Sequence, residues 1–260
     1  MRRPIIAGNW KMNKTIAEAI ELVNGLKRNL YTVDDAEIIV CPPYTALTEV
    51  AELLPGANIA LGAQDMCWED KGAFTGEVSA PMLKDAGCTH VIIGHSERRQ
   101  YCNETNETVN KKVKAALRAG LIPIMCVGER LPEREGGRTF DVVRDHLLSG
   151  LKDVSADDLP RVIIAYEPVW AIGTGKNATP QQAQEVHTFI RDLLAKTYSS
   201  AVASCVRIQY GGSVTPENAG PLMSEPDVDG ALVGGASLKI DSFTQIVKKA
   251  SEVKKKCTHS

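Results

Sequence analysis

Three features are scarce in this sequence of 260 residues: aromatic side chains, long apolar runs and charge of one sign. Aromatic residues make up 5% of the chain, but hydrophobic residues of all kinds make up 43%, which is enough for a sizeable core. No apolar run approaches the roughly 18–20 residues of a membrane-spanning helix. The 30 basic and 32 acidic residues leave a net charge of -2, which argues against binding nucleic acid or a membrane surface through bulk charge.

Paired cysteine motifs are also missing. The chain has 7 cysteines, an odd number, and even the closest two, Cys88 and Cys102, are too far apart in sequence for a Cys-x-x-Cys pair. This excludes the common zinc and redox motifs. The N-terminal segment has two arginines but no apolar stretch, so we expect no export signal. We therefore predict reduced, mostly buried thiols and a cytoplasmic location.

Eight short apolar runs recur along the chain, and several are continuous rather than alternating, as in parallel strands covered on both faces. The runs are Ile5-Gly8, Glu37-Cys41, Asn58-Gly62, His90-Gly94, Ile122-Val127, Val162-Tyr166, Val206-Tyr210 and Gly230-Val233. Eight strand-plus-helix units of about 32 residues match a (β/α)8 barrel, which is typically about 250 residues long. An open doubly wound sheet would usually contain fewer units. No linker divides the chain, so we predict one α/β domain over residues 1–260.

Helix signals lie between the apolar runs. Residues Thr105 to Ala119 place apolar side chains at helical spacing. Thr179, followed by Pro180 and then Gln182, supplies an N-cap, a first-turn proline and a capping-box glutamine. Thr215-Pro216 repeats the start, and we expect a last helix from about Ile240 toward Lys256.

Glu167 is the most informative single residue. It follows a buried apolar run, and Pro168 cannot donate a hydrogen bond to a sheet, so the strand should stop at about Glu167. The loop beyond it closes on Gly173 and Gly175. A carboxylate at the end of a buried strand, beside a flexible loop, is a candidate general base next to a lid. A strand-terminal glutamate before an ordinary surface loop is the alternative interpretation.

Other polar residues follow other runs at equivalent positions. Asn9 and Lys11 end the first run, and His95 and Ser96 follow the fourth. In a barrel, the carboxyl ends of the strands form the active site, so an amide, a cation, a histidine and a carboxylate would face one cavity. Each residue alone is weak evidence, since a lone histidine or lysine is more often structural or solvated. Their coincidence favours a catalytic site.

Glycine pairs follow the seventh and eighth runs, in Gly211-Gly212-Ser213 and Gly234-Gly235-Ala236. Glycine lets backbone N–H groups approach a ligand closely, and barrels commonly hold phosphate in these loops. Tight turns are the alternative explanation, but the repetition in adjacent loops favours phosphate.

Two nucleotide motifs fail. The segment Gly173-Thr174-Gly175-Lys176-Asn177-Ala178 fits the loose dinucleotide fingerprint, but it does not directly follow a strand, and no acid for a ribose lies at the required distance. It also fails as a phosphate-binding P-loop, because Asn177 stands where serine or threonine should follow the lysine.

The chain resembles triosephosphate isomerases from end to end, through long motifs in the family's order. They are Gly8-Asn9-Trp10-Lys11-Met12-Asn13, Gly94-His95-Ser96-Glu97-Arg98-Arg99, Cys126-Val127-Gly128-Glu129, the stretch from Ala165 to Gly175, Tyr210-Gly211-Gly212-Ser213-Val214 and Leu232-Val233-Gly234-Gly235-Ala236-Ser237-Leu238. The resemblance implies a TIM barrel that interconverts dihydroxyacetone phosphate and D-glyceraldehyde 3-phosphate in glycolysis and gluconeogenesis. It implies neither metal nor cofactor.

The resemblance also implies roles for individual residues, and the family is a familiar example of acid–base groups tuned by their surroundings. Glu167 would move a proton between neighbouring carbons through an enediol(ate). His95, as a neutral imidazole, would polarise the carbonyl, and its place at a helix start should lower its pKa. Lys11 would add positive charge near the oxyanion and Asn9 a further donor. Glu97 and Ser96 would support the site.

For the phosphate, the resemblance implies amides near Gly173, Ser213, Gly234 and Gly235. The contact from Gly173 would depend on closure of the loop from Pro168 to Ala178. Asn177 departs from the threonine or valine that is more frequent at this hinge, which bears on closing kinetics.

As partners, the resemblance implies a triose phosphate and a second copy of the chain. The loop around Gln64-Glu77 would reach the other subunit near its Lys11. We expect neither a nucleic acid nor a membrane partner, and a solvated, frayed basic tail over Lys254-Ser260. Two alternative functions are considered. The first is another phosphate-binding barrel enzyme, which would not explain Lys11, His95 and Glu167 together, and the second is a non-catalytic scaffold.

Overall fold

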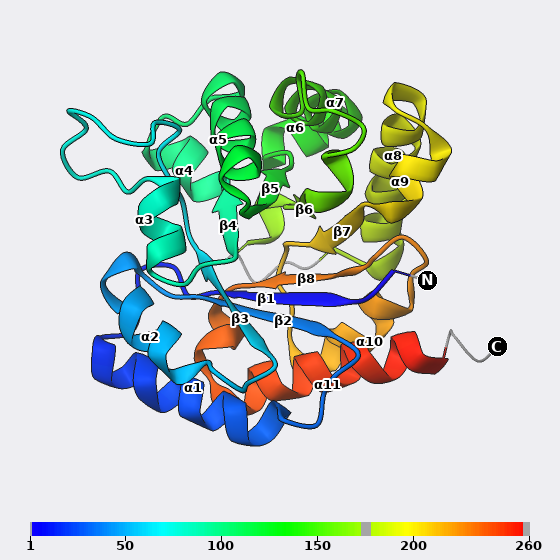
Figure 1. Ribbon diagram of the computed structural model, residues 1–260. Coiled ribbons are helices and arrows are strands. Elements are labelled where there is room, and N and C mark those ends of the chain that lie inside the picture. Colours follow the sequence, from blue (N-terminus) through cyan, green and yellow to red (C-terminus); the bar gives the residue numbers. More distant parts are fainter. Residues whose placement is uncertain (1, 173–177, 257–260) are drawn as a thin grey trace.

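Eight parallel strands close into a barrel in the computed structural model, which describes residues 2–172 and 178–256 (Figure 1). Each strand pairs with the next in sequence, and β1 pairs with β8 to close the ring. The strands are β1 Ile5–Asn9, β2 Glu37–Cys41, β3 Ile59–Ala63, β4 His90–Ile93, β5 Ile122–Val127, β6 Ile163–Tyr166, β7 Arg207–Tyr210 and β8 Gly230–Val233. The predicted (β/α)8 barrel is confirmed.

Helices form the outer layer. They are α1 Ile16–Leu30, α2 Leu47–Leu53, α3 Ala80–Asp85, α4 Ser96–Tyr101, α5 Asn106–Ala119, α6 Leu131–Glu135, α7 Thr139–Gly150, α8 Pro180–Thr197, α9 Ser200–Cys205, α10 Pro216–Ser224 and α11 Ile240–Lys256. Thr105, Thr179 and Thr215 each form the N-cap of a capping box, at the starts of α5, α8 and α10. These caps satisfy backbone N–H groups that have no partner inside the helix. The helix starts predicted from Thr179 and Thr215, and the helix predicted from the apolar spacing after Thr105, are confirmed.

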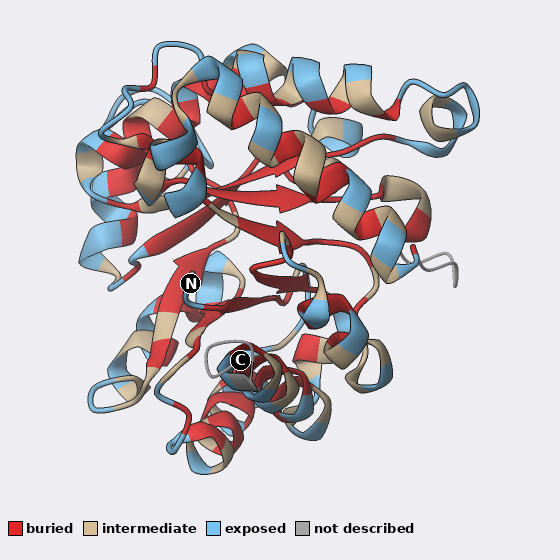
Figure 2. Cartoon of the chain, turned by 90° about the vertical axis from the view of Figure 1, so that its right-hand side faces the viewer, coloured by how far each residue is buried: buried red, intermediate tan, exposed pale blue. Residues whose placement is uncertain are grey.

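The strands are buried on both faces because two apolar layers meet on them (Figure 2). In β1, Ile5 and Ala7 belong to the cluster inside the barrel, whereas Ile6 packs in the larger cluster between strands and helices. This explains why the apolar runs are continuous rather than alternating.

Three polar side chains form an ion-paired group at the amino-terminal end of the barrel. Glu37, His90 and Arg207 are the first residues of three strands. His90 Nε2 lies 3.0 Å from Glu37 Oε1, and Arg207 also bonds Glu37. Burial would raise the pKa of Glu37, but His90 and Arg207 outweigh it and lower the pKa from 4.5 to about 2.

We expect Glu37→Gln to lower the free energy of unfolding at pH 7 by about 3 kcal/mol, the equivalent of this pKa shift. Because the folded-state pKa lies below the ordinary value, the carboxylate stabilises the fold above about pH 4.5 and loses this effect as the pH falls toward about 2. Urea unfolding of both proteins between pH 7 and pH 2 checks this. The difference in free energy of unfolding between the wild type and Glu37→Gln should disappear on acidification. The exposed control Glu107→Gln should show almost no difference from the wild type. A difference independent of pH would contradict the prediction.

Most thiols lie where the sequence predicts. Cys41, Cys67, Cys88 and Cys126 are buried and free, whereas Cys102 and Cys205 are free and exposed. Cys257 lies outside the described residues. No helix in the described part of the chain is long and apolar enough to cross a membrane.

One prediction about the basic C-terminal segment is wrong. Lys254 is not part of a frayed end: it lies in α11, is buried, and its Nζ donates to the Glu225 carbonyl at 3.2 Å. The lysine stem covers apolar surface while the ammonium finds a carbonyl, which charge counting along a sequence cannot foresee.

Candidate active site

The predicted polar residues meet at the carboxyl end of the barrel. Asn9 is the last residue of β1, His95 follows β4 and Glu167 follows β6. Gly128 packs directly against the backbone of Glu167. A Cβ atom at position 128 would lie 1.7 Å from the Glu167 carbonyl oxygen, so this close approach requires glycine. The Glu167 amide donates to the Val127 carbonyl at 2.8 Å. The backbone around Glu167 is thus fixed by the neighbouring strand.

The Glu167 carboxylate is 2% exposed and fully bonded. Its Oε1 lies 2.9 Å from His95 Nε2, and its Oε2 accepts from the Ser96 amide at 2.9 Å. The Ser96 hydroxyl also donates to Oε1, at 3.2 Å. Burial would raise the pKa of Glu167, but His95 and Ser96 outweigh it and lower the pKa. The group is therefore an ionised carboxylate at neutral pH, as a general base must be.

His95 is the N-cap of α4, and the Glu97 amide donates to its Nδ1 at 3.2 Å. A ring nitrogen that accepts carries no proton, so this bond places the proton on Nε2, which faces Glu167. Burial lowers the pKa of His95, but the Glu167 carboxylate outweighs it, and the net direction is upward. The prediction of a lowered pKa is wrong for this arrangement, because a carboxylate at 2.9 Å exceeds the effect of burial and helix start.

Lys11 is held in an unusual backbone conformation, with φ at 52°. Its amide donates to Asn9 Oδ1 at 3.0 Å, and Gln64 Nε2 donates to its carbonyl at 2.8 Å. Its ammonium lies 2.5 Å from Glu97 Oε1. Strained, over-determined backbone is typical of functional sites. The Gln64 contact was not predicted, because the sequence indicates Gln64 only as the start of a loop.

A cavity of about 390 Å³ lies beside these residues. Its lining comprises Asn9, Lys11, His95, Glu97, Ile172, Gly211, Gly212, Ser213, Val214, Thr215, Leu232, Gly234, Gly235 and Ala236. Every predicted site residue except three lines this cavity. Glu167 and Ser96 line a neighbouring cavity instead. Gly173 lies outside the described residues, as does Asn177.

No group of three or more His, Cys, Asp or Glu side chains in the described ranges could hold a metal ion. The cavity's charge comes from Lys11 and Glu97, and its walls include the two glycine pairs. Glycines without side chains let backbone N–H groups reach an anionic ligand.

The family model for triosephosphate isomerase matches residues 4–250. The chain belongs to the triosephosphate isomerase family. It is 56% identical to the triosephosphate isomerase of Alkaliphilus metalliredigens over 95% of this chain and 99% of that one. The triosephosphate isomerases of Caldanaerobacter subterraneus subsp. tengcongensis and Carboxydothermus hydrogenoformans are each 59% identical, again over 95% of this chain and 99% of theirs.

One buried group of this triosephosphate isomerase family member was not predicted. Glu129 is fully buried, and its carboxylate accepts from the Tyr166 hydroxyl at 3.1 Å and from Trp170 Nε1 at 2.8 Å. The Val169 amide donates to its carbonyl at 3.0 Å. Glu129 therefore fixes the first residues of the loop that follows Glu167. The available signal was a carboxylate just beyond the fifth apolar run, at a position equivalent to Glu167.

We expect Tyr166→Phe to lower the free energy of unfolding by about 2 kcal/mol, because it removes one hydrogen bond to a buried carboxylate. The matched control is Tyr198→Phe, which loses a longer bond to a neutral carbonyl, 3.3 Å from the Leu151 oxygen. Urea unfolding of both variants makes the comparison. An equal or smaller loss in Tyr166→Phe would show that Glu129 does not depend on this bond.

Proposed function

We propose that the chain interconverts dihydroxyacetone phosphate and D-glyceraldehyde 3-phosphate, in glycolysis and gluconeogenesis, with Glu167 as the base. Family membership over residues 4–250 carries this proposal. Lys11, His95 and Glu167 at one end of the barrel support it, because an amine, an imidazole and a carboxylate are the groups that the reaction needs. We further propose that residues 1–260 act as one domain.

The phosphate would lie against Ser213, Gly234 and Gly235, in the cavity that Lys11 also lines. The short 3-10 helix Gly235–Leu238 begins there, and we expect its first amides to donate to the phosphate. Phosphate contacts mainly tighten binding, because they are equal in ground and transition states. We also propose a contact near Gly173 after closure of the loop.

Glu167 has to turn before it can act. Both of its oxygens are bonded to Ser96 or His95, and it lines the neighbouring cavity rather than the one beside Lys11. Rotation of the side chain would carry the carboxylate toward the substrate carbon. The same rotation removes the larger of the two negative charges that raise the pKa of His95, leaving the smaller effect of Glu97, so that burial then favours the neutral imidazole.

The reaction would then run by proton transfer alone. Glu167 takes a proton from the carbon beside the carbonyl, and the electron pair of that C–H bond forms the enediol(ate). His95 donates from Nε2 to the developing oxyanion and exchanges the hydroxyl proton between the two oxygens. Glu167 returns a proton to the neighbouring carbon. Lys11 stabilises the oxyanion, with Asn9 as a further donor.

Glu97 would position Lys11. Its carboxylate holds the ammonium at 2.5 Å, and its amide fixes the tautomer of His95. It thus acts through two other groups rather than on the substrate. Ser96 would play the same supporting part for Glu167.

We also propose a cytoplasmic homodimer, formed through the loop around Gln64-Glu77. This loop projects from the barrel between β3 and α3 (Figure 1). Phe74 in this loop is 44% exposed, and Met12 beside Lys11 is 95% exposed, so a second subunit docking here would find apolar side chains to cover. Free cysteines throughout the described residues support a reducing compartment.

We expect sedimentation equilibrium to give twice the chain mass of 28.1 kDa, and Phe74→Asp to sediment as a monomer at micromolar concentration. A charge buried in an apolar interface without a partner is costly. The control is Tyr31→Asp, an exposed aromatic residue at the end of α1, which should stay dimeric. A monomeric wild type would overturn the proposed dimer.

Turnover of glyceraldehyde 3-phosphate, coupled to reduction of the ketone product, tests the activity itself. We expect fast turnover without added metal or cofactor. A correctly folded protein that binds phosphate but shows no turnover would instead support the scaffold.

A further inference from the structure

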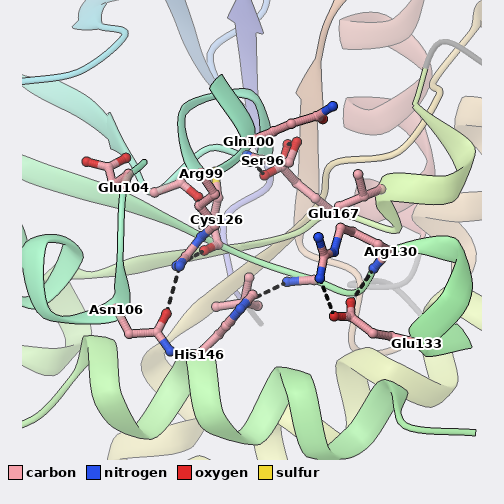
Figure 3. Close-up of a pocket in the computed structure, with 14 residues that line it drawn as sticks. Ser96, Arg99, Gln100, Glu104, Asn106, Cys126, Arg130, Glu133, His146 and Glu167 are labelled. Carbon is pink, nitrogen blue, oxygen red and sulfur yellow. Dashed lines mark hydrogen bonds and ion pairs between the residues drawn. The ribbon is translucent and has the colours of Figure 1, made fainter. Parts of the chain in front are cut away.

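A second cavity, of about 330 Å³, lies beside Glu167 and shares no lining residue with the cavity beside Lys11 (Figure 3). His95 lines one cavity, and its neighbour Ser96 lines the other. The second cavity lies among the ends of β4, β5 and β6 and the helices that follow them. The proposed reaction leaves most of its lining unused. Its volume is in the usual range for small-molecule sites, about 300–1,000 Å³.

Arg99, in this lining, is a half-buried cation that forms no direct ion pair with the described residues. Its guanidinium donates to three neutral acceptors: the Gly94 carbonyl at 2.9 Å, Asn106 Oδ1 at 2.7 Å and the Cys126 carbonyl at 3.4 Å. No Asp or Glu oxygen of the described residues lies within 4.0 Å of its nitrogens. Burial lowers the pKa of Arg99 by more than the nearby carboxylates of Glu104, Glu167 and Asp145 raise it. An unpaired charge away from water is costly, and an anion in the cavity would offset that cost.

His146 supplies a second donor to the same cavity. Its Nδ1 accepts from the Gly128 amide at 3.3 Å, so the proton of the neutral ring is on Nε2. Burial, and then the charge of Arg99, lower the pKa of His146 to about 4, which keeps the ring neutral at pH 7. Nε2 has no hydrogen-bond partner in the described part of the chain. Arg130 adds a further cation, with its side chain 73% exposed.

The carboxylates of the lining are already bonded. Glu104 pairs with Lys112, and Glu133 pairs with Arg130 at 3.0 Å and also accepts the Arg130 amide at 2.7 Å. Glu167 is held by Ser96 and His95. Each carboxylate thus has an ion-pair partner, and Glu104 Oε2, 3.8 Å from Arg98 Nε, is the one buried oxygen among them without a hydrogen bond in the described residues, whereas Arg99 and His146 keep donor capacity. This imbalance favours a ligand that accepts hydrogen bonds and carries negative charge.

We propose that this cavity binds a small oxyanion, such as inorganic phosphate, sulfate or a small carboxylate, between Arg99 and His146. The site is separate from the one for the substrate phosphate. Because Glu167 also lines the cavity, the bound anion places like charge beside the base and raises its pKa. The isomerase would thereby respond to the concentration of an ion that is not its substrate.

Selenate soaked into crystals grown with saturating glycerol 3-phosphate tests the site, because the non-reacting substrate analogue fills the cavity beside Lys11. We expect an anomalous peak within hydrogen-bond distance of Arg99 and His146. Calorimetric titration with sulfate under the same conditions should show one further site. Parallel titrations with phosphate and acetate separate a tetrahedral from a planar oxyanion.

Three variants sharpen the test. Arg99→Gln and His146→Phe should each weaken sulfate binding about tenfold or more, and the control Arg118→Gln, on the exposed face of α5, should leave it unchanged. His146→Phe keeps the three bonds of Arg99, so it serves if Arg99→Gln does not fold. No selenate peak, a peak only beside Lys11, or unchanged binding in both cavity variants would each overturn the proposal.

A kinetic readout comes next. Sulfate at saturation should raise the pKa on the acid limb of kcat/KM in the wild type and not in His146→Phe. This readout rests on Glu167 being the base, whereas the crystal and calorimetric measurements do not. Loss of the kinetic shift with binding intact would therefore count against the base assignment, and loss of binding would count against the oxyanion site.

Discussion

Replacing Glu167 by glutamine should lower kcat/KM by about 10²–10⁴, the usual contribution of a positioned general base. Glutamine matches the size of glutamate and can still accept from the Ser96 amide, so the change removes basicity with little change of packing. Glu167→Asp should retain the base but withdraw it by one methylene, and a displacement of about 1 Å from the productive position costs about 10². The coupled assay measures both variants.

Folding and active-site occupancy have to be controlled in this comparison. Circular dichroism should show a wild-type spectrum for Glu167→Gln, and glycerol 3-phosphate should still bind, since the phosphate contacts are elsewhere. Glu107→Gln, an exposed carboxylate paired with Lys111 on α5, is the matched control and should keep full activity. If Glu167→Gln retained kcat/KM within tenfold of the wild type, another group would have to be the base.

Lys11→Met should lower kcat/KM by about 10²–10³, the cost of removing one preorganised charge that faces the transition state. Lys11 is the one permanent cation among the described residues that line the cavity. Its loss also leaves the Glu97 carboxylate unpaired beside a dianionic substrate, which adds repulsion. Lys11→Arg should recover part of the loss, limited by the shape of the guanidinium.

A double mutant separates these two effects. In Lys11→Met with Glu97→Gln, the unpaired carboxylate is gone, so the combined loss should be smaller than the product of the single losses. Lys111→Met, which removes an exposed lysine of α5, is the control and should keep full activity. Strict multiplicativity would mean that Glu97 does not act through Lys11. A loss of stability without loss of kcat/KM in Lys11→Met would remove Lys11 from the mechanism.

Much of the site could be predicted from sequence because strand ends in a barrel converge. The apolar runs fix the strands, and the residues just after them, such as Asn9, His95 and Glu167, must then lie at one end. The capping threonines likewise place the helix starts. These features depend on local spacing, which is visible in one sequence.

The direction of the Glu167 side chain could not be predicted in this way. Ser96 and His95 draw the carboxylate into the neighbouring cavity, and this contact reverses the predicted direction of the pKa of His95. A side-chain torsion set by three contacts with two residues has no signature in residue spacing. The same is true of Glu129 and Arg99, whose partners come from different strands and helices.

Deuterium incorporation into dihydroxyacetone phosphate in D₂O, followed by proton NMR, tests proton removal by Glu167 directly. The substrate carbon loses its proton signal only if a base removes the proton and the base exchanges with solvent. The account predicts rapid exchange with the wild type and a loss of about 10²–10⁴ in the exchange rate with Glu167→Gln, in step with isomerisation. Exchange at the wild-type rate in Glu167→Gln would contradict it.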